Sequence, residues 1–183
     1  MRNTQFRHAI CRLIVAASLI TVPLAAQQKG ASAESPAGVQ TALANDVGNL
    51  SDKFTGLARV MAGKYDWRPG QGVRSVGEVL NLIVGENKML NNVLSGTPAQ
   101  AGPQAAPITD PAALQEALRS SYATLRQTIA GLSASDTQAN VKMFGRDMTK
   151  QAAAFLLLFD QHEHLGQSIA YARTNGVVPP WSK

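Results

Sequence analysis

Apolar side chains recur at every third or fourth position from Val39 to Met61, which places them on one face of an α-helix. The stripe consists of Val39, Leu43, Val47, Leu50, Phe54, Leu57 and Met61. We therefore expect a helix over about 37–62. The next stretch, GKYDWRPGQGVRS, contains three glycines and a proline and predicts a loop.

A second helix is predicted after this loop. Ser75 and Glu78 have the spacing of a capping box, in which each side chain accepts a hydrogen bond from the other residue's backbone N–H. A broad apolar face follows and ends near Ser95-Gly96. Residues 96–109 are rich in Pro, Ala and Gly and predict a long connection.

A third helix is predicted over 111–131, because Asp110-Pro111 supplies an N-cap and a first-turn proline, and apolar residues follow at helical spacing. Residues 133–146 are polar and mixed, so we expect a loop with at most one helical turn. No alternating pattern typical of a β-strand is visible along the chain.

The last helix is predicted from about Asp147 to a helix stop at Asn175-Gly176. Within it, AAAFLLLF at 152–159 is apolar on every side and must be buried in a bundle or against another chain. The four helices predict an all-α antiparallel bundle that forms one domain over 37–183.

Residues 1–26 have the order of a secretory signal peptide, with three arginines ahead of an apolar run that starts at Leu13. This run is shorter than the about 20 residues of a spanning helix and contains Pro23. An uncleaved membrane anchor is the alternative. We expect cleavage near Ala26, a flexible leader over 27–36 and a periplasmic or secreted protein without stable membrane insertion.

The formal net charge of +5 falls to 14 − 12 = +2 once the three arginines of the predicted signal are removed. No cluster of Lys and Arg remains, so we expect no nucleic-acid partner. Cys11 is the only cysteine and lies in the predicted signal. The mature chain would therefore contain no disulfide and no thiolate for catalysis or metal binding.

The stretch DQHEHLGQ at 160–167 contains two histidines and two carboxylates. Successive helical residues turn by about 100°, so His162 and His164 point about 160° apart and cannot bind one ion. Asp160 and His164 lie four residues apart on one face and could share a metal. Gln167 could donate a hydrogen bond to His164. A zinc site usually needs three protein ligands, so another helix must supply the third.

Two longer motifs resemble those of a known family. HLGQSIAYARTNGVVPPWS at 164–182 and DWRPGQGVRSVGEVL at 66–80 are similar to segments of the DinB-like four-helix-bundle family. The resemblance implies an up-down-down-up bundle that is often dimeric. It also implies a divalent metal on three histidines in many members, some of which are thiol-dependent transferases and isomerases.

Carried over position by position, the resemblance implies a changed metal site. The second histidine of the family's helix-four pair falls on His164, the first falls on Asp160, and the helix-two histidine falls on Leu82. Glu86 lies one turn beyond Leu82 on the same face and could replace the missing ligand. Such an oxygen-rich set suits a harder ion than a thiolate zinc site does. We expect weak binding of Zn, Ni or Mn.

Each candidate also has a structural interpretation. Asp160 and His164 can form a hydrogen-bonded pair within the helix, and Glu86 can be a solvated or Arg-paired carboxylate. Trp67 and Trp181 are expected to pack the loop before the second helix and the tail.

We expect an exported helical bundle with a degenerate metal site that binds a small molecule or a protein and is not an active enzyme. The alternative is a divalent-metal-dependent transferase or hydrolase that uses Asp160 and His164. The direction of Glu86 separates them, because a third ligand is needed for the metal chemistry. The apolar segment at 152–159 and the family resemblance also predict a homodimer.

Overall fold

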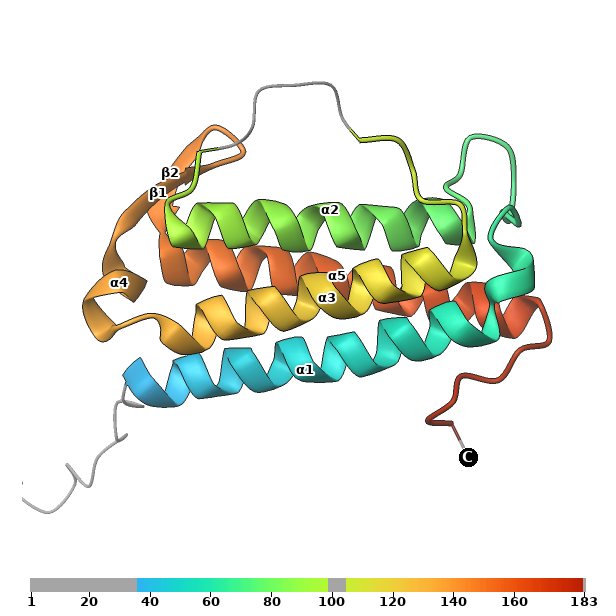
Figure 1. Ribbon diagram of the computed structural model, residues 1–183, viewed down its shortest axis with the longest axis horizontal. Coiled ribbons are helices and arrows are strands. Elements are labelled where there is room, and N and C mark those ends of the chain that lie inside the picture. The colour runs from blue at the N-terminus through green and yellow to red at the C-terminus, as the bar shows by residue number, and fades with distance from the viewer. Residues whose placement is uncertain (1–35, 99–104, 183) are drawn as a thin grey trace, which may run out of the picture. The chain divides into compact units, whose positions relative to one another are not determined.

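Figure 1 shows a computed structural model of the protein, which describes residues 36–98 and 105–182. The predicted signal peptide and almost all of the predicted leader lie outside the described residues. The described part is mostly helical, and four long helices account for most of it. They are α1 (Pro36–Val60), α2 (Val76–Ser95), α3 (Pro111–Gly131) and α5 (Lys150–Thr174).

The ends of α2 and α3 follow the signals in the sequence. Ser75 and Glu78 form the predicted capping box at the start of α2. Gly96 closes α2 in the left-handed conformation, with φ of 72°, which glycine adopts without a steric cost. At the start of α3, the Asp110 side chain accepts a hydrogen bond from the Ala113 N–H. Local capping chemistry therefore sets these boundaries.

The core lies between the four long helices, because α1 and α2 each pack against both α3 and α5. Its middle contains Phe54 of α1 and Tyr122 of α3, whose stacked rings are 6.2 Å apart. Leu80 and Leu90 of α2 and Leu157 of α5 are buried around them. Burial of each such side chain contributes roughly 1.5–3 kcal/mol. The bundle therefore rests on one continuous apolar core.

The first helix ends slightly earlier than predicted. After α1 ends at Val60, one turn of 3₁₀ helix, η2 (Ala62–Lys64), leads into the loop. In the loop, Trp67 packs against the core, as expected. Trp181 is also in contact with the bundle, because a Cβ added at Gly56 of α1 would meet its ring at 3.7 Å.

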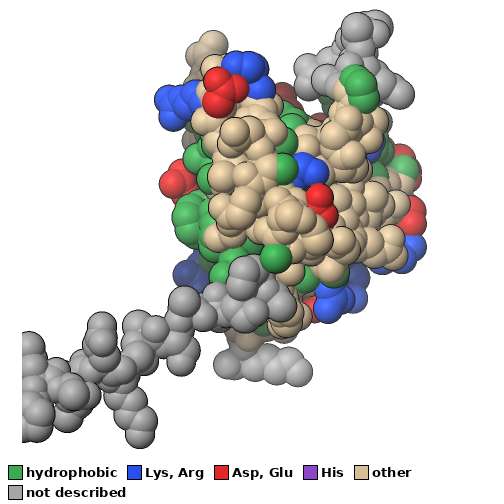
Figure 2. All heavy atoms as spheres, turned by 90° about the vertical axis from the view of Figure 1, so that its left-hand side faces the viewer, with side chains coloured by type: hydrophobic (Ala, Val, Ile, Leu, Met, Phe, Trp, Pro, Cys, Tyr) green, Lys and Arg blue, Asp and Glu red, His purple; other side chains and the backbone are tan. Residues whose placement is uncertain are grey.

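The segment between α3 and α5 corrects the prediction that the chain has no strands. It contains a short helix, α4 (Ala134–Gln138), and an antiparallel hairpin of β1 (Asn140–Met143) and β2 (Arg146–Thr149). Figure 2 shows the end of the molecule where the hairpin lies, with acidic and basic side chains next to one another. Each strand has only four residues, which is too short to show a period of two clearly.

The hairpin also moves the start of the last helix from the predicted Asp147 to Lys150. Asp147 lies in β2 and pairs with Lys142 across the strands at 3.0 Å. Thr149 then caps α5 by accepting a hydrogen bond from the Ala152 N–H.

The apolar segment of α5 is only partly covered by the bundle. Ala153, Ala154, Leu157 and Leu158 are buried, whereas Leu156 and Phe159 are exposed by 41% and 62%. No helix among the described residues is long and apolar enough to cross a membrane.

Candidate metal centre

Three side chains with metal-ligating atoms meet between α2 and α5. Glu86 comes from α2, and Asp160 and His164 come from successive turns of α5. The Nε2 atom of His164 lies 3.8 Å from Oε1 of Glu86 and 3.7 Å from Oδ2 of Asp160. One donor atom from each residue lies within 4.8 Å of the others. The structure thus brings together the three residues singled out in the sequence.

Glu86 is buried, with 7% of its surface exposed, so the alternative of a solvated carboxylate is wrong. Burial, followed by the nearby Asp160 carboxylate, raises the pKa of Glu86 to about 7, and Gln161 and Arg74 oppose this shift weakly. Oε2 of Glu86 is buried without a hydrogen-bond partner among the described residues. A buried, unpartnered carboxylate oxygen costs free energy unless a proton or cation reaches it.

The two ligands on α5 differ in their contact with solvent. The side chain of His164 is 17% exposed and that of Asp160 is 49% exposed, so the centre opens to solvent on the Asp160 side. The 3.7 Å separation between them is longer than a hydrogen bond, so a direct intrahelical hydrogen bond does not account for the pair.

A chain of hydrogen bonds selects the tautomer of the His164 ring. The carbonyl oxygen of Arg74 can only accept, so the Tyr171 hydroxyl donates to it at 3.2 Å. The Tyr171 oxygen then accepts from Nε2 of Gln167 at 2.8 Å, which leaves the Gln167 carbonyl oxygen facing Nδ1 of His164 at 3.0 Å. Nδ1 must therefore carry the proton. Neutral His164 presents the lone pair of Nε2 to the two carboxylates.

The same chain of hydrogen bonds ties the centre to the loop before α2. The ring of Trp67 packs edge-on against that of Tyr171, with centroids 5.3 Å apart. Gln167 thus contacts His164, but as a hydrogen-bond acceptor and not as the predicted donor. Sequence reasoning missed that Tyr171 joins α5 to this loop through its hydroxyl, because no local pattern links Tyr171 to Arg74.

A buried polar network beneath the centre was also missed. Gln161 donates to Asn87 at 2.8 Å, Asn87 donates to Ser121 at 3.1 Å, and Tyr122 donates to Gln161 at 3.1 Å. All four side chains are buried, and together they join α2, α3 and α5. Asn87 and Gln161 directly follow Glu86 and Asp160 in the chain. The network therefore holds the two helices in the register that makes the carboxylates face each other.

The remaining candidates lie apart from this centre. His162 pairs with Asp46 of α1 at 3.0 Å, in agreement with the prediction that it cannot share an ion with His164. Leu82 is half-buried one turn before Glu86 on α2. An aliphatic side chain cannot bind a metal at this position, so α2 can contribute a ligand through Glu86 instead.

The arrangement fits a divalent ion. Ligand atoms that bind one ion at about 2.1 Å lie about 3.0–3.5 Å apart, so the two donor distances from His164, 3.8 and 3.7 Å, exceed this range by only a few tenths of an ångström. A cation at this place would bind the lone pair of His164 and the Oε1 oxygen of Glu86. Two carboxylates and one imidazole suit Mn or Zn better than a soft, thiolate-binding ion.

Comparisons with known proteins agree with the fold. The sequence profile of the DinB superfamily matches residues 52–168, which is more than half of the chain. A crystal structure of a DinB-like protein from Bacillus subtilis is similar, with a TM-score of 0.64 at 16% sequence identity. The similarity covers 78% of this chain and 97% of that chain. No curated protein gives a significant match. The chain belongs to the DinB superfamily.

Proposed function

We propose that the protein binds a divalent metal ion through Glu86, Asp160 and His164 and uses it in a transferase or hydrolase reaction. The main support for this proposal is the buried carboxylate of Glu86. It can act as the third ligand, whereas the family resemblance places that ligand at position 82, which is a leucine here. A bound divalent ion would supply Lewis acidity for activation of a nucleophile such as water or a thiol.

The chain's own residues have distinct roles in this proposal. Gln167 and Tyr171 hold the proton on Nδ1 of His164, so that Nε2 remains available as a ligand. Glu86 contributes a ligand from a site shielded from water. The partly exposed Asp160 lies on the open side, where a substrate can approach.

The proposal also covers the order of the helices, the oligomeric state and the location of the protein. We infer an up-down-down-up order for α1, α2, α3 and α5, which is supported by the chain directions in Figure 1 and by the long connection between α2 and α3. We also infer a homodimer, which is supported by the exposed Leu156 and Phe159 on α5. Export to the periplasm or the medium rests on the order of residues 1–26 alone.

A second candidate function is a binding module with a degenerate metal site. It is favoured by Leu82, which stands where the family resemblance implies a histidine. On this interpretation, the wild-type protein binds metal only weakly, and Leu82→His raises the affinity by restoring the family's ligand.

Metal titration separates the two functions. The mature protein, stripped with a chelator, would be titrated with Zn²⁺, Mn²⁺ and Ni²⁺ by calorimetry and analysed for metal content. We expect one ion per chain and at least a tenfold loss of affinity in Glu86→Gln and His164→Ala, because each removes one of three ligands. His162→Ala is the matched control on the same helix and should bind like the wild type. Equal binding by all four proteins would reject the proposed centre.

A further inference from the structure

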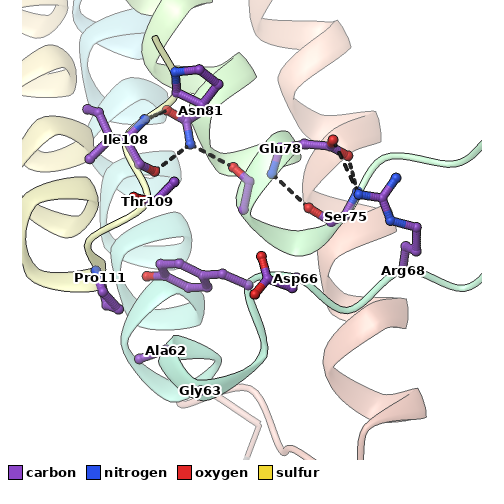
Figure 3. A pocket seen from close by; sticks show the side chains of 13 residues that line it. Ala62, Gly63, Asp66, Arg68, Ser75, Glu78, Asn81, Ile108, Thr109 and Pro111 are labelled. Atoms are coloured by element: carbon purple, nitrogen blue, oxygen red, sulfur yellow. Dashed lines mark hydrogen bonds and ion pairs between the residues drawn. The ribbon is translucent and has the colours of Figure 1, made fainter.

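A cavity of about 440 Å³ lies beside the start of α2, away from the metal centre. Figure 3 shows its walls, which come from the loop after α1, the first turns of α2 and the segment before α3. None of the three proposed metal ligands lines it. Its volume lies within the range of about 300–1,000 Å³ that is common for small-molecule sites.

Most polar side chains of this cavity are already satisfied by the chain itself. Asn81 bonds to Gly77 and to both backbone groups of Ile108. Glu78 accepts from the Ser75 N–H at 2.6 Å and pairs with Arg68 at 3.3 Å. These groups shape the wall and have little capacity left for a charged ligand (Figure 3).

The start of α2 is also poorly suited to an anion, although helix N-termini often bind one. The N–H of Val76 donates to Trp67, that of Gly77 to Tyr65, and that of Glu78 to Ser75. Gly77 packs so closely on Tyr65 that an added Cβ would lie 3.2 Å from its carbonyl oxygen. The backbone donors that would bind an anion are therefore occupied and covered.

Asp66 is the exception among the charged groups of the cavity. Its carboxylate has no hydrogen-bond or ion-pair partner within the described ranges 36–98 and 105–182, and it lies at the cavity near Ser75 in Figure 3. Apolar surface from Ile108 and Pro111 forms much of the opposite wall. Glu78 is neutralised by Arg68, so the uncompensated charge of this lining is negative.

We propose that this cavity binds a small organic cation, with a primary or quaternary ammonium group at Asp66 and an apolar body against Ile108 and Pro111. The carboxylate supplies the charge complement, and the apolar wall supplies burial for the body of the ligand. This inference is independent of the metal centre, so either can fail without the other.

The proposal is tested with three probes of similar shape that differ in charge: 2-phenylethylamine as the cation, 2-phenylethanol as the neutral analogue and phenylacetate as the anion. Each would be titrated into ¹⁵N-labelled mature protein, and the amide shifts of Gly63, Gly77 and Thr109 would report on the cavity. We expect the cation to bind most tightly and the anion most weakly.

Asp66→Asn should weaken binding of the amine about threefold to fivefold and leave binding of the alcohol unchanged, because only the interaction with an exposed charge is removed. Asp52→Asn, which changes an exposed carboxylate of α1 outside the cavity, is the matched control. Equal affinity for all three probes, no effect of Asp66→Asn, or shifts confined to other parts of the bundle would overturn the proposal. The amide spectrum of each variant also reports whether it is folded.

Discussion

Replacement of Glu86 by Gln should stabilise the metal-free protein at pH 8 while it weakens metal binding. The folded state raises the pKa of Glu86 from 4.5 to about 7, chiefly through burial and then through Asp160. At pH 8 the folded wild type must therefore hold a buried negative charge. Glutamine has nearly the same shape and removes that charge.

The gain in unfolding free energy of Glu86→Gln can be worked out from the pKa shift of Glu86. A rise of roughly 2.5 pKa units at about 1.4 kcal/mol per unit sets an upper limit of roughly 3.5 kcal/mol. Because Asp160 is half exposed, solvent screens the pair, and we expect about 1.5 kcal/mol. Urea unfolding in the presence of a chelator measures this difference.

The pH dependence has a definite sign. Between pH 4.5 and about 7 the folded state binds a proton at Glu86 that the unfolded chain has released. The free energy of unfolding of the wild type therefore falls as pH rises through this window. The advantage of Glu86→Gln should be near zero at pH 4, grow through the window and stay constant above pH 7.

Glu78→Gln on the same helix is the control, because its effect on stability at pH 8 should have the opposite sign. Hydrogen bonding from the Ser75 backbone lowers the pKa of Glu78, so its charge stabilises the fold at neutral pH and this benefit is lost as pH falls. That variant should be less stable than the wild type at pH 8. A Glu86→Gln protein that is destabilised at pH 8, or whose difference from the wild type does not change with pH, would refute the argument.

Three further predictions follow from other parts of the chain. Tyr171→Phe keeps the ring against Trp67 but removes the hydroxyl that orients Gln167. In ¹⁵N NMR of the metal-free variant, His164 should therefore change from mainly the Nδ1–H tautomer to a mixture of both tautomers. An unchanged tautomer would contradict the assigned hydrogen bonds. Phe159→Glu should convert a homodimer into a monomer in light scattering, because it places a charge on the exposed apolar face of α5, and a wild type that is already monomeric would disprove the predicted dimer. Amino-terminal sequencing of protein from fractionated cells should find the chain starting near Gln27 outside the cytoplasm, and an intact Met1 in the cytoplasm would exclude export.

The long helices could be predicted because their signals are local. The capping box at Ser75 and the N-cap at Asp110 each act within three residues, and the structure has both. The hairpin could not be predicted in the same way. Its turn consists of Phe144 and Gly145, where Asn-Gly or Asp-Gly would be the usual signal. Phe144 has φ of 49°, a conformation that bulky residues seldom adopt, so the sequence gives no indication of this turn.

The candidate centre shows a different limit of sequence reasoning. Helical geometry alone predicted that Asp160 and His164 share a face and that His162 does not. The burial of Glu86 could have been suspected, because it continues the series Val79, Ile83 and Leu90 at spacings of three and four. That series marks the face of α2 that turns inward. It does not reveal that Asp160 and His164 of α5 lie opposite, since their approach depends on how two distant helices pack.

In the proposed centre, Glu86 takes the role that the family resemblance assigns to position 82, which is four residues earlier on α2. Four residues along a helix correspond to about 6 Å and slightly more than one full turn, so a ligand moved by this distance stays on the same face. The polar network that includes Asn87 and Gln161 adjoins the moved ligand and Asp160, and it fixes the register of α2 against α5. Replacement of both network residues by leucine should therefore weaken metal binding even though all three ligands remain, because the carboxylates would lose their fixed separation. Metal titration of the Asn87→Leu, Gln161→Leu double variant tests this, with circular dichroism to verify the fold. Undiminished affinity in a folded variant would show that the network supports the core and does not position the centre.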